Sequence, residues 1–194
     1  MRARRAAPSE ARTRVLETAD RLFYREGIRT VGIDRIIAEA GVAKMTLYAH
    51  FPSKDDLILA VLKYKEQQML EFFHTAMERH AVRSRDTLRA FFAALKEWFE
   101  SPGFRGCAFQ NAAAELADPK HPGTRFVRDH KRRFAEILRG FVDEAAGRNA
   151  AKLGPTIAMI VEGAIVTAVV QGTPEPADLA RDAVLKLIKE SKGV

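Results

Sequence analysis

The spacing of apolar residues along the chain predicts helices throughout. Apolar side chains recur every three or four positions in almost every segment. No segment alternates apolar and polar residues between tight turns, as a half-buried strand would. We therefore expect an all-α fold, with about nine helices by this periodicity.

Gly and Pro residues divide the first third of the chain into short helices. Ser9 is a good N-cap for the first one. The expected breaks are at Gly27, Gly41 and Pro52, which leaves short helices near residues 10–26, 33–40 and 43–50. Ser53 can cap a fourth helix that continues to about His80, long enough to connect two modules.

Longer helices follow in the remaining two thirds. Ser84 can cap a fifth helix with a heavy aromatic stripe, and two more are expected near residues 107–117 and 124–146. The eighth is expected to begin at Gly154-Pro155, because Pro suits the first helical position, and it is apolar almost all round. The ninth follows a Pro-rich turn near residue 175.

Residues 33–52 have the length and punctuation of a helix-turn-helix. Gly41 can adopt the left-handed conformation of the tight turn, and apolar residues on both sides can lock the two helices together. The outer face of the second helix then projects five side chains, which are Lys44, Met45, Thr46, Tyr48 and His50.

These side chains suit a major groove of DNA. Lys44 can meet phosphate or guanine, Thr46 can donate to a base or phosphate, and Met45 can touch a thymine methyl group. Tyr48 and His50 are expected nearer the phosphates. Lys54, in the first turn of the next helix, is expected to add a phosphate contact.

The same segment resembles the DNA-binding domain of the TetR family of bacterial repressors. The resemblance covers about residues 9–60 and is carried by the motifs at 27–28, 36–42, 46–48, 50–51 and 53–57. It implies an all-helical homodimer, a palindromic double-stranded DNA operator, and a C-terminal effector pocket that releases DNA when filled. Gly32 and Asp34 depart from the Ser or Thr and the basic residue that the family often has there, so the usual phosphate contacts at these positions are not expected.

The resulting domain organisation has three parts. Residues 1–8 form a basic N-terminal arm, residues 9–56 the helix-turn-helix domain, and residues 57–194 a helical domain for effector binding and dimerisation. A small apolar or aromatic effector is expected among polar and aromatic side chains of the last domain, namely Phe91, Trp98, Asn111, Phe126, His130 and Phe134. Ordinary core packing of these aromatic residues is the alternative.

A helix that is apolar on every side must be covered on every side. We therefore expect the last two helices to form a four-helix dimer interface, with contacts from Met159, Gly163, Ala164, Val184 and Ile188. The alternative is that the eighth helix is simply central to one protomer.

Charge and composition narrow the function classes. The net charge of +7 favours a polyanionic partner, and Arg2, Arg4 and Arg5 concentrate charge in the arm. The lone Cys107 forms no disulfide within the chain and, as a thiol without a resolving partner, is expected to be a small buried hydrophobe. No His spacing for a metal, no GxSxG and no P-loop is present, so we expect no cofactor, no metal and no enzyme activity.

The N-terminal arginines are not followed by an apolar signal segment, and the apolar run at residues 156–170 is expected to be too short for a bilayer. These features predict a cytoplasmic protein with no membrane partner, and the resemblance to the TetR family implies that it is bacterial. The leading function is a transcriptional repressor released from its operator by a small molecule. The alternative is a helical carrier or enzyme whose basic charge is incidental.

Overall fold

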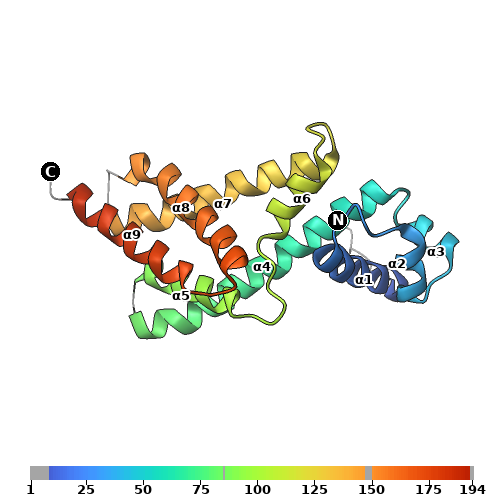
Figure 1. The fold of residues 1–194 in the computed structure, drawn as a ribbon, viewed down its shortest axis with the longest axis horizontal. Helices are drawn as coiled ribbons and strands as arrows, with labels where there is room; N and C mark the ends of the chain where they lie inside the picture. The colour runs from blue at the N-terminus through green and yellow to red at the C-terminus, as the bar shows by residue number, and fades with distance from the viewer. Residues whose placement is uncertain (1–8, 85, 147–149, 193–194) are drawn as a thin grey trace, which may run out of the picture. The chain divides into compact units, whose positions relative to one another are not determined.

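The structure is a computed structural model that describes residues 9–84, 86–146 and 150–192. Within these ranges every regular element is a helix, which confirms the predicted all-α class (Figure 1). The basic arm, residues 1–8, lies outside the described residues. The helices are α1 (Glu10–Glu26), α2 (Ile33–Ala40), α3 (Lys44–His50), α4 (Lys54–Ser84), α5 (Thr87–Phe99), α6 (Ala108–Leu116), α7 (Pro122–Ala146), α8 (Ala150–Gln171) and α9 (Pro176–Lys192).

The helices group into two compact units. The first unit contains residues 1–66 and 108–127, and the second contains residues 67–107 and 128–194. The chain therefore crosses between units three times, and α4 and α7 each contribute residues to both. This division differs from the predicted boundary at residues 56–57, because α6 and the first turn of α7 group with the N-terminal helices.

The first unit is built on α1. Ser9 caps the helix, since its Oγ accepts from the Arg12 backbone N–H (3.2 Å). The face that α1 buries is the predicted one, made of Val15, Leu16, Ala19, Leu22 and Phe23. Helices α2 and α3 pack against α1 and against each other, and Ile36 and Leu47 at that junction are fully buried.

The second unit has an aromatic core. Phe91 on α5 is 2% exposed, and its ring lies 5.7 Å from that of Phe73, 5.8 Å from that of Phe141 and 6.4 Å from that of Phe134. Helix α9 packs on α8 and on α5. Aromatic pairs at these separations stabilise a core beyond their buried area.

Two helix boundaries differ from the sequence prediction. Helix α8 begins at Ala150, so that Pro155 lies inside it rather than at its first position. The N-cap of α5 is Asp86, whose side chain accepts from the Arg89 backbone N–H (3.1 Å), whereas the expected cap, Ser84, is the last residue of α4. Ser84 can continue the helix that precedes it, because Ser is tolerated within a helix, whereas Pro155 has no N–H to donate to the preceding turn of α8.

The apolar helix α8 is also longer than expected. Its segment Leu153–Gln171 is long and apolar enough to span a bilayer, so the expectation that this run is too short was wrong. A single helix of this length and hydropathy is weak evidence for a membrane protein, because the core helix of a soluble protein can be equally long and apolar.

Candidate functional site

The turn between α2 and α3 has the geometry of a helix-turn-helix. Gly41 is left-handed (φ 60°, ψ 44°), and its N–H closes the end of α2 by donating to the carbonyls of Ile37 and Ala38. Helix α3 follows after two residues, and Leu47 on its inner face is fully buried. A short helix is thus held by one face, and its opposite face is free.

The free face of α3 carries the side chains expected to contact DNA. Met45 is 80% exposed and Tyr48 is exposed too, whereas Thr46 and His50 are half-buried. The Lys44 Nζ lies 3.5 Å from the Asp34 Oδ1, and both side chains are largely exposed. Such a pair contributes little to stability, so Lys44 can exchange Asp34 for another anion.

Helix α1 extends this surface through two contacts that the sequence interpretation missed. Ser9 Oγ is hydrogen-bonded to His50 Nε2 (2.9 Å), at the end of α3. The Arg12 guanidinium lies over the Phe51 ring, 5.2 Å from its centre. The residues are about forty positions apart, so no local pattern in the sequence connects them. The basic arm therefore joins the described chain beside the end of α3.

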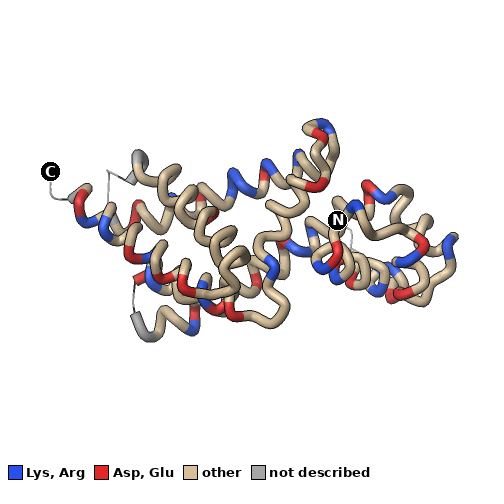
Figure 2. The backbone as a smooth tube through the Cα atoms, viewed as in Figure 1, with Lys and Arg blue, Asp and Glu red and all other residues tan. Residues whose placement is uncertain are grey.

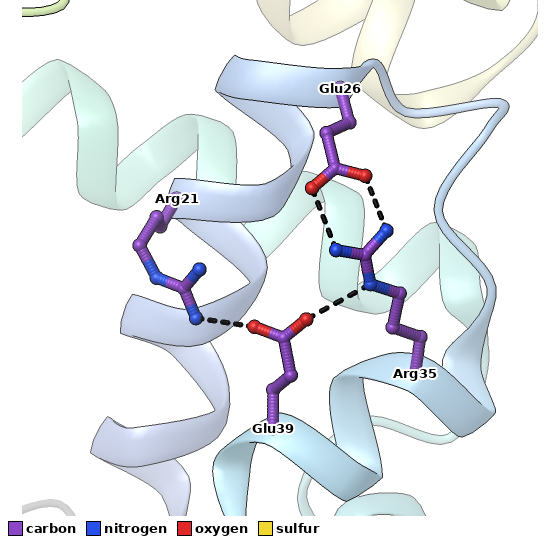
Figure 3. Close-up of polar contacts among 4 residues, drawn as sticks. All are labelled: Arg21, Glu26, Arg35 and Glu39. Carbon is purple, nitrogen blue, oxygen red and sulfur yellow. Dashed lines mark hydrogen bonds and ion pairs between the residues drawn. The ribbon is translucent and has the colours of Figure 1, made fainter.

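Four charged side chains join α1 to α2 (Figure 3). Arg35 donates to both carboxylate oxygens of Glu26 and to Glu39 Oε1 (2.9 Å), and Arg21 donates to Glu39 Oε2 (2.7 Å). The hydrogen bonds from Arg21 and Arg35 hold the pKa of Glu39 below its usual value. Both arginines are thus occupied by carboxylates and add no net positive charge to this surface.

Lys54 is less available than the sequence suggested. Its side chain is half-buried, its Nζ lies 5.9 Å from the centre of the Phe23 ring, and burial lowers the pKa of its ammonium group. The expected phosphate contact by Lys54 is therefore weaker than that of the exposed Lys44.

Charge along the described backbone is mixed rather than confined to one helix. Figure 2 shows Lys and Arg interleaved with Asp and Glu in both units. Positive charge near α3 therefore comes from individual residues such as Lys44 and Arg12.

The second unit contains a small apolar cavity. Trp98, His130 and Phe134, three of the residues expected at an effector pocket, line it. The other lining residues are Met69, Phe73, Leu95, Cys107, Lys131 and Ile165. Its volume is about 10 Å³, which is room for about one water molecule. A small organic molecule could enter only if side chains such as Met69 moved.

The remaining three expected pocket residues lie elsewhere. Phe91 belongs to the aromatic core beside the cavity, as the alternative held. Asn111 and Phe126 belong to the first unit, and Asn111 lines a separate cavity there. Their spacing placed them correctly on helices, but the side of the helix that meets a cavity depends on packing that spacing does not encode.

A polar cluster borders the second-unit cavity. Lys131 Nζ lies 2.7 Å from each carboxylate oxygen of Glu162 and 3.3 Å from Cys107 Sγ. Cys107 is buried, as expected. Among the described residues no group of three His, Cys, Asp or Glu side chains is arranged to hold a metal ion.

The expected dimer residues fall into two classes. Ala164, Val184 and Ile188 are buried inside the second unit, where they pack α8 and α9 within one protomer, so a partner cannot reach them. Met159 is 68% exposed, and Gly163 has open space where a Cβ would lie. Val166 and Val170, which are exposed, share their face of α8 because the spacing 159, 163, 166, 170 is helical.

Two family models match the chain. Residues 15–61 match the model described as bacterial regulatory proteins, tetR family, and residues 84–184 match the tetracyclin repressor-like C-terminal domain. The second match covers more than half of the chain.

Solved structures and curated relatives agree with these matches. A TetR-family transcriptional regulator from Streptomyces coelicolor superposes with a TM-score of 0.83 at 36% identity, over 95% of this chain and 97% of that one. The HTH-type transcriptional activator FasR of Mycolicibacterium smegmatis is 35% identical over 106 residues, 54% of this chain; that match spans about half (48%) of FasR. The uncharacterized HTH-type transcriptional regulator YxaF of Bacillus subtilis is 24% identical over 93% of this chain and 96% of its own length.

Proposed function

Because this chain belongs to the TetR family of bacterial transcriptional regulators, we propose that it represses transcription as a homodimer on a palindromic operator. A small apolar or aromatic molecule releases it. The observation that carries the DNA-binding part is the free face of α3, where Lys44, Met45 and Tyr48 are exposed after the left-handed turn at Gly41. An 80% exposed methionine beside a lysine stabilises nothing within the protomer, but it suits a thymine methyl group next to a phosphate or guanine.

The roles of the α3 side chains follow from their positions. Lys44, Met45 and Thr46 begin the helix and contact base edges, while Tyr48 and His50 reach the phosphates. Lys54 makes a secondary phosphate contact, since it is half-buried.

A homodimer explains the exposed apolar face of α8. Met159, Val166 and Val170 lie on that face with Gly163 between them, and Leu179 at the start of α9 is exposed as well. Gly163 allows a second copy of the helix to approach closely, and a two-fold axis pairs each residue with its own symmetry mate. This covers the apolar face without a membrane, and a DNA-binding role places the protein in the bacterial cytoplasm.

The cavity at Trp98, His130 and Phe134 is the effector site in this proposal. Its aromatic lining suits an apolar or aromatic molecule, and the buried His130 supplies one polar group. A carrier is less well supported, because it gives no role to the exposed Lys44, Met45 and Tyr48 on α3. FasR is named an activator, whereas in this proposal the bound dimer covers a promoter and so blocks transcription.

The test is selection of bound duplexes from a random DNA pool by the purified protein, followed by gel shifts with the recovered sequence. We expect a palindrome whose half-sites are about one helical turn apart. Trp98, the single tryptophan, borders the cavity, so its fluorescence then reports binding of candidate aromatic compounds. If no sequence is enriched, the proposal is wrong; if a compound saturates Trp98 quenching without changing operator affinity, only the switch is wrong.

A further inference from the structure

The corner between α6 and α7, residues 115–121, contacts the helix-turn-helix module at both of its ends. One contact is to the loop that leads from α1 into α2, and the other is to the first turn of α4, just after α3. All of these residues belong to the first unit. The corner therefore contacts the chain just before α2 and just after α3, on either side of the segment that carries Lys44, Met45 and Tyr48.

Glu115 makes the contact at the entry to α2. The Arg29 backbone N–H donates to Glu115 Oε2 (3.1 Å). At the neighbouring Gly27, which has a φ of +95°, an added Cβ would lie 2.8 Å from the same oxygen. Gly27 therefore both turns the chain and leaves room for the carboxylate.

His121 makes the contact at the exit from α3. Its Nδ1 accepts from the Gly123 backbone N–H (2.9 Å), so the ring proton of a neutral imidazole is on Nε2. That nitrogen lies 3.2 Å from Asp55 Oδ1, within the range of an ion pair. The His121 side chain is 12% exposed, so the ring is packed rather than free in solvent.

The two helices of the motif lack side-chain caps of their own. The N-cap residues of α2 and α3 are Gly32 and Ala43, and neither offers a side-chain hydrogen bond. Ser or Thr at such positions fixes a helix start locally. Here the carboxylate of Glu115, 86 residues further along the chain than Arg29, holds the loop that leads into α2.

The corner itself is strained. Ala117 has a φ of +51°, a left-handed conformation that is unfavourable for a residue with a Cβ. Such strain persists only where surrounding contacts fix the backbone. Glu115 and His121 lie on either side of Ala117 and supply those contacts.

We propose that Glu115 and His121 are positioning residues for operator binding, which hold α2 and α3 in the orientation that places α3 in the major groove. The inference rests on the proposed function and deepens it.

The experiment compares Glu115→Ala with Glu115→Gln in the full-length protein. Both remove the same negative charge, but the glutamine Oε1 still accepts from the Arg29 N–H. His121→Ala and His121→Gln form a second pair, since glutamine keeps a donor for Asp55. Glu136→Ala, on the exposed surface of α7, controls for loss of an unrelated carboxylate.

Three measurements are made on each variant: amide hydrogen exchange at Arg29, affinity for the selected operator, and affinity for random DNA. In Glu115→Ala the Arg29 amide should exchange about tenfold faster than in the wild type, and the affinity for the operator should fall about fivefold. Both changes are those expected for the loss of one net hydrogen bond. Its affinity for random DNA should stay unchanged, because phosphate contacts tolerate a tilted α3. Glu115→Gln and Glu136→Ala should resemble the wild type, and His121→Ala should weaken operator binding while His121→Gln does not.

The proposal is overturned if Glu115→Ala and Glu115→Gln give equal Arg29 exchange and equal operator affinity. It is also overturned if operator and random DNA lose affinity together with a lower melting temperature, since that shows a role in folding alone. Failure of the wild type to select any operator would contradict the proposed function instead, and Arg29 exchange would still decide whether the corner holds the loop.

Discussion

The two units place their functional side chains in opposite environments. In the first unit, Met45 is 80% exposed and Tyr48 is 38% exposed on a seven-residue helix, and neither side chain belongs to the core. In the second unit, Trp98, His130 and Phe134 line a cavity inside the aromatic core. A DNA-binding surface can be built from side chains that the fold does not need for its stability. A ligand-binding pocket, in contrast, is built from core side chains on which that stability depends.

The largest effect expected from this difference is on stability. Phe91→Ala should lower the free energy of unfolding by about 3–5 kcal/mol, because it leaves a cavity among Phe73, Phe134 and Phe141. Met45→Ala, at a position that is 80% exposed, should change it by less than about 0.5 kcal/mol while weakening DNA binding. Chemical denaturation at one fixed protein concentration measures both. If both variants lost the same free energy of unfolding, this difference between the two units would be wrong.

The next effect concerns the exposed face of α8. Val166→Glu, at a position that is 50% exposed in the protomer, should weaken dimerisation by about 100-fold, because two-fold symmetry places the charge in the interface twice. The protomer should stay folded. Analytical ultracentrifugation across micromolar concentrations tests this, with Glu136→Ala as the control. A Val166→Glu variant that remains dimeric rules out this face as the interface.

Smaller changes are expected within the DNA surface itself. Lys44→Ala should cost about 1–3 kcal/mol and change the base preference, whereas the half-buried Lys54 should give a smaller and sequence-independent loss. Binding to operators with single base changes, at several salt concentrations, separates the two. If Lys44→Ala weakens every sequence equally, Lys44 contacts phosphate only.

The smallest effect is a pH dependence in the second unit. The hydrogen bond from Lys96 (2.6 Å) holds the pKa of Asp178 below its usual value of 3.8. A lowered carboxyl pKa contributes stability above the unfolded-state pKa and loses it as the pH falls through the folded-state pKa. Asp178→Asn should therefore lower the melting temperature at neutral pH, and the difference should shrink as the pH falls below 3.8. If the change in melting temperature did not depend on pH, or if the exposed Asp143→Asn gave the same pH profile, the Lys96–Asp178 hydrogen bond would not be its cause.

Local features of the first unit could be predicted from the sequence. The cap at Ser9, the left-handed Gly41 and the buried face of α1 are encoded within a few residues, since caps and turns need particular side chains at particular spacings. The exposed side chains of α3 followed from the same spacing. The Ser9–His50 hydrogen bond and the Glu115 contact with Arg29 did not, because they join positions far apart in sequence.

The sequence predicted burial less well where tertiary packing decides which of several apolar helix faces is covered. Met159 on α8 and Val184 on α9 are both apolar residues at helical spacing, yet the first is exposed and the second is fully buried. Asn111 is similar: it was expected at the effector pocket but belongs to the first unit. Periodicity shows that a residue faces an apolar environment or solvent, but not which helix covers it.

The three crossings between the units have a consequence for attempts to recombine this regulator with others. A contiguous N-terminal fragment ending at residue 66 lacks residues 108–127, which complete the first unit. A chimera that joins this fragment to the body of another regulator therefore imports a foreign α6, and with it a foreign partner for the Arg29 amide. Modular exchange of DNA specificity should succeed only when residues 108–127 are transplanted together with residues 1–66.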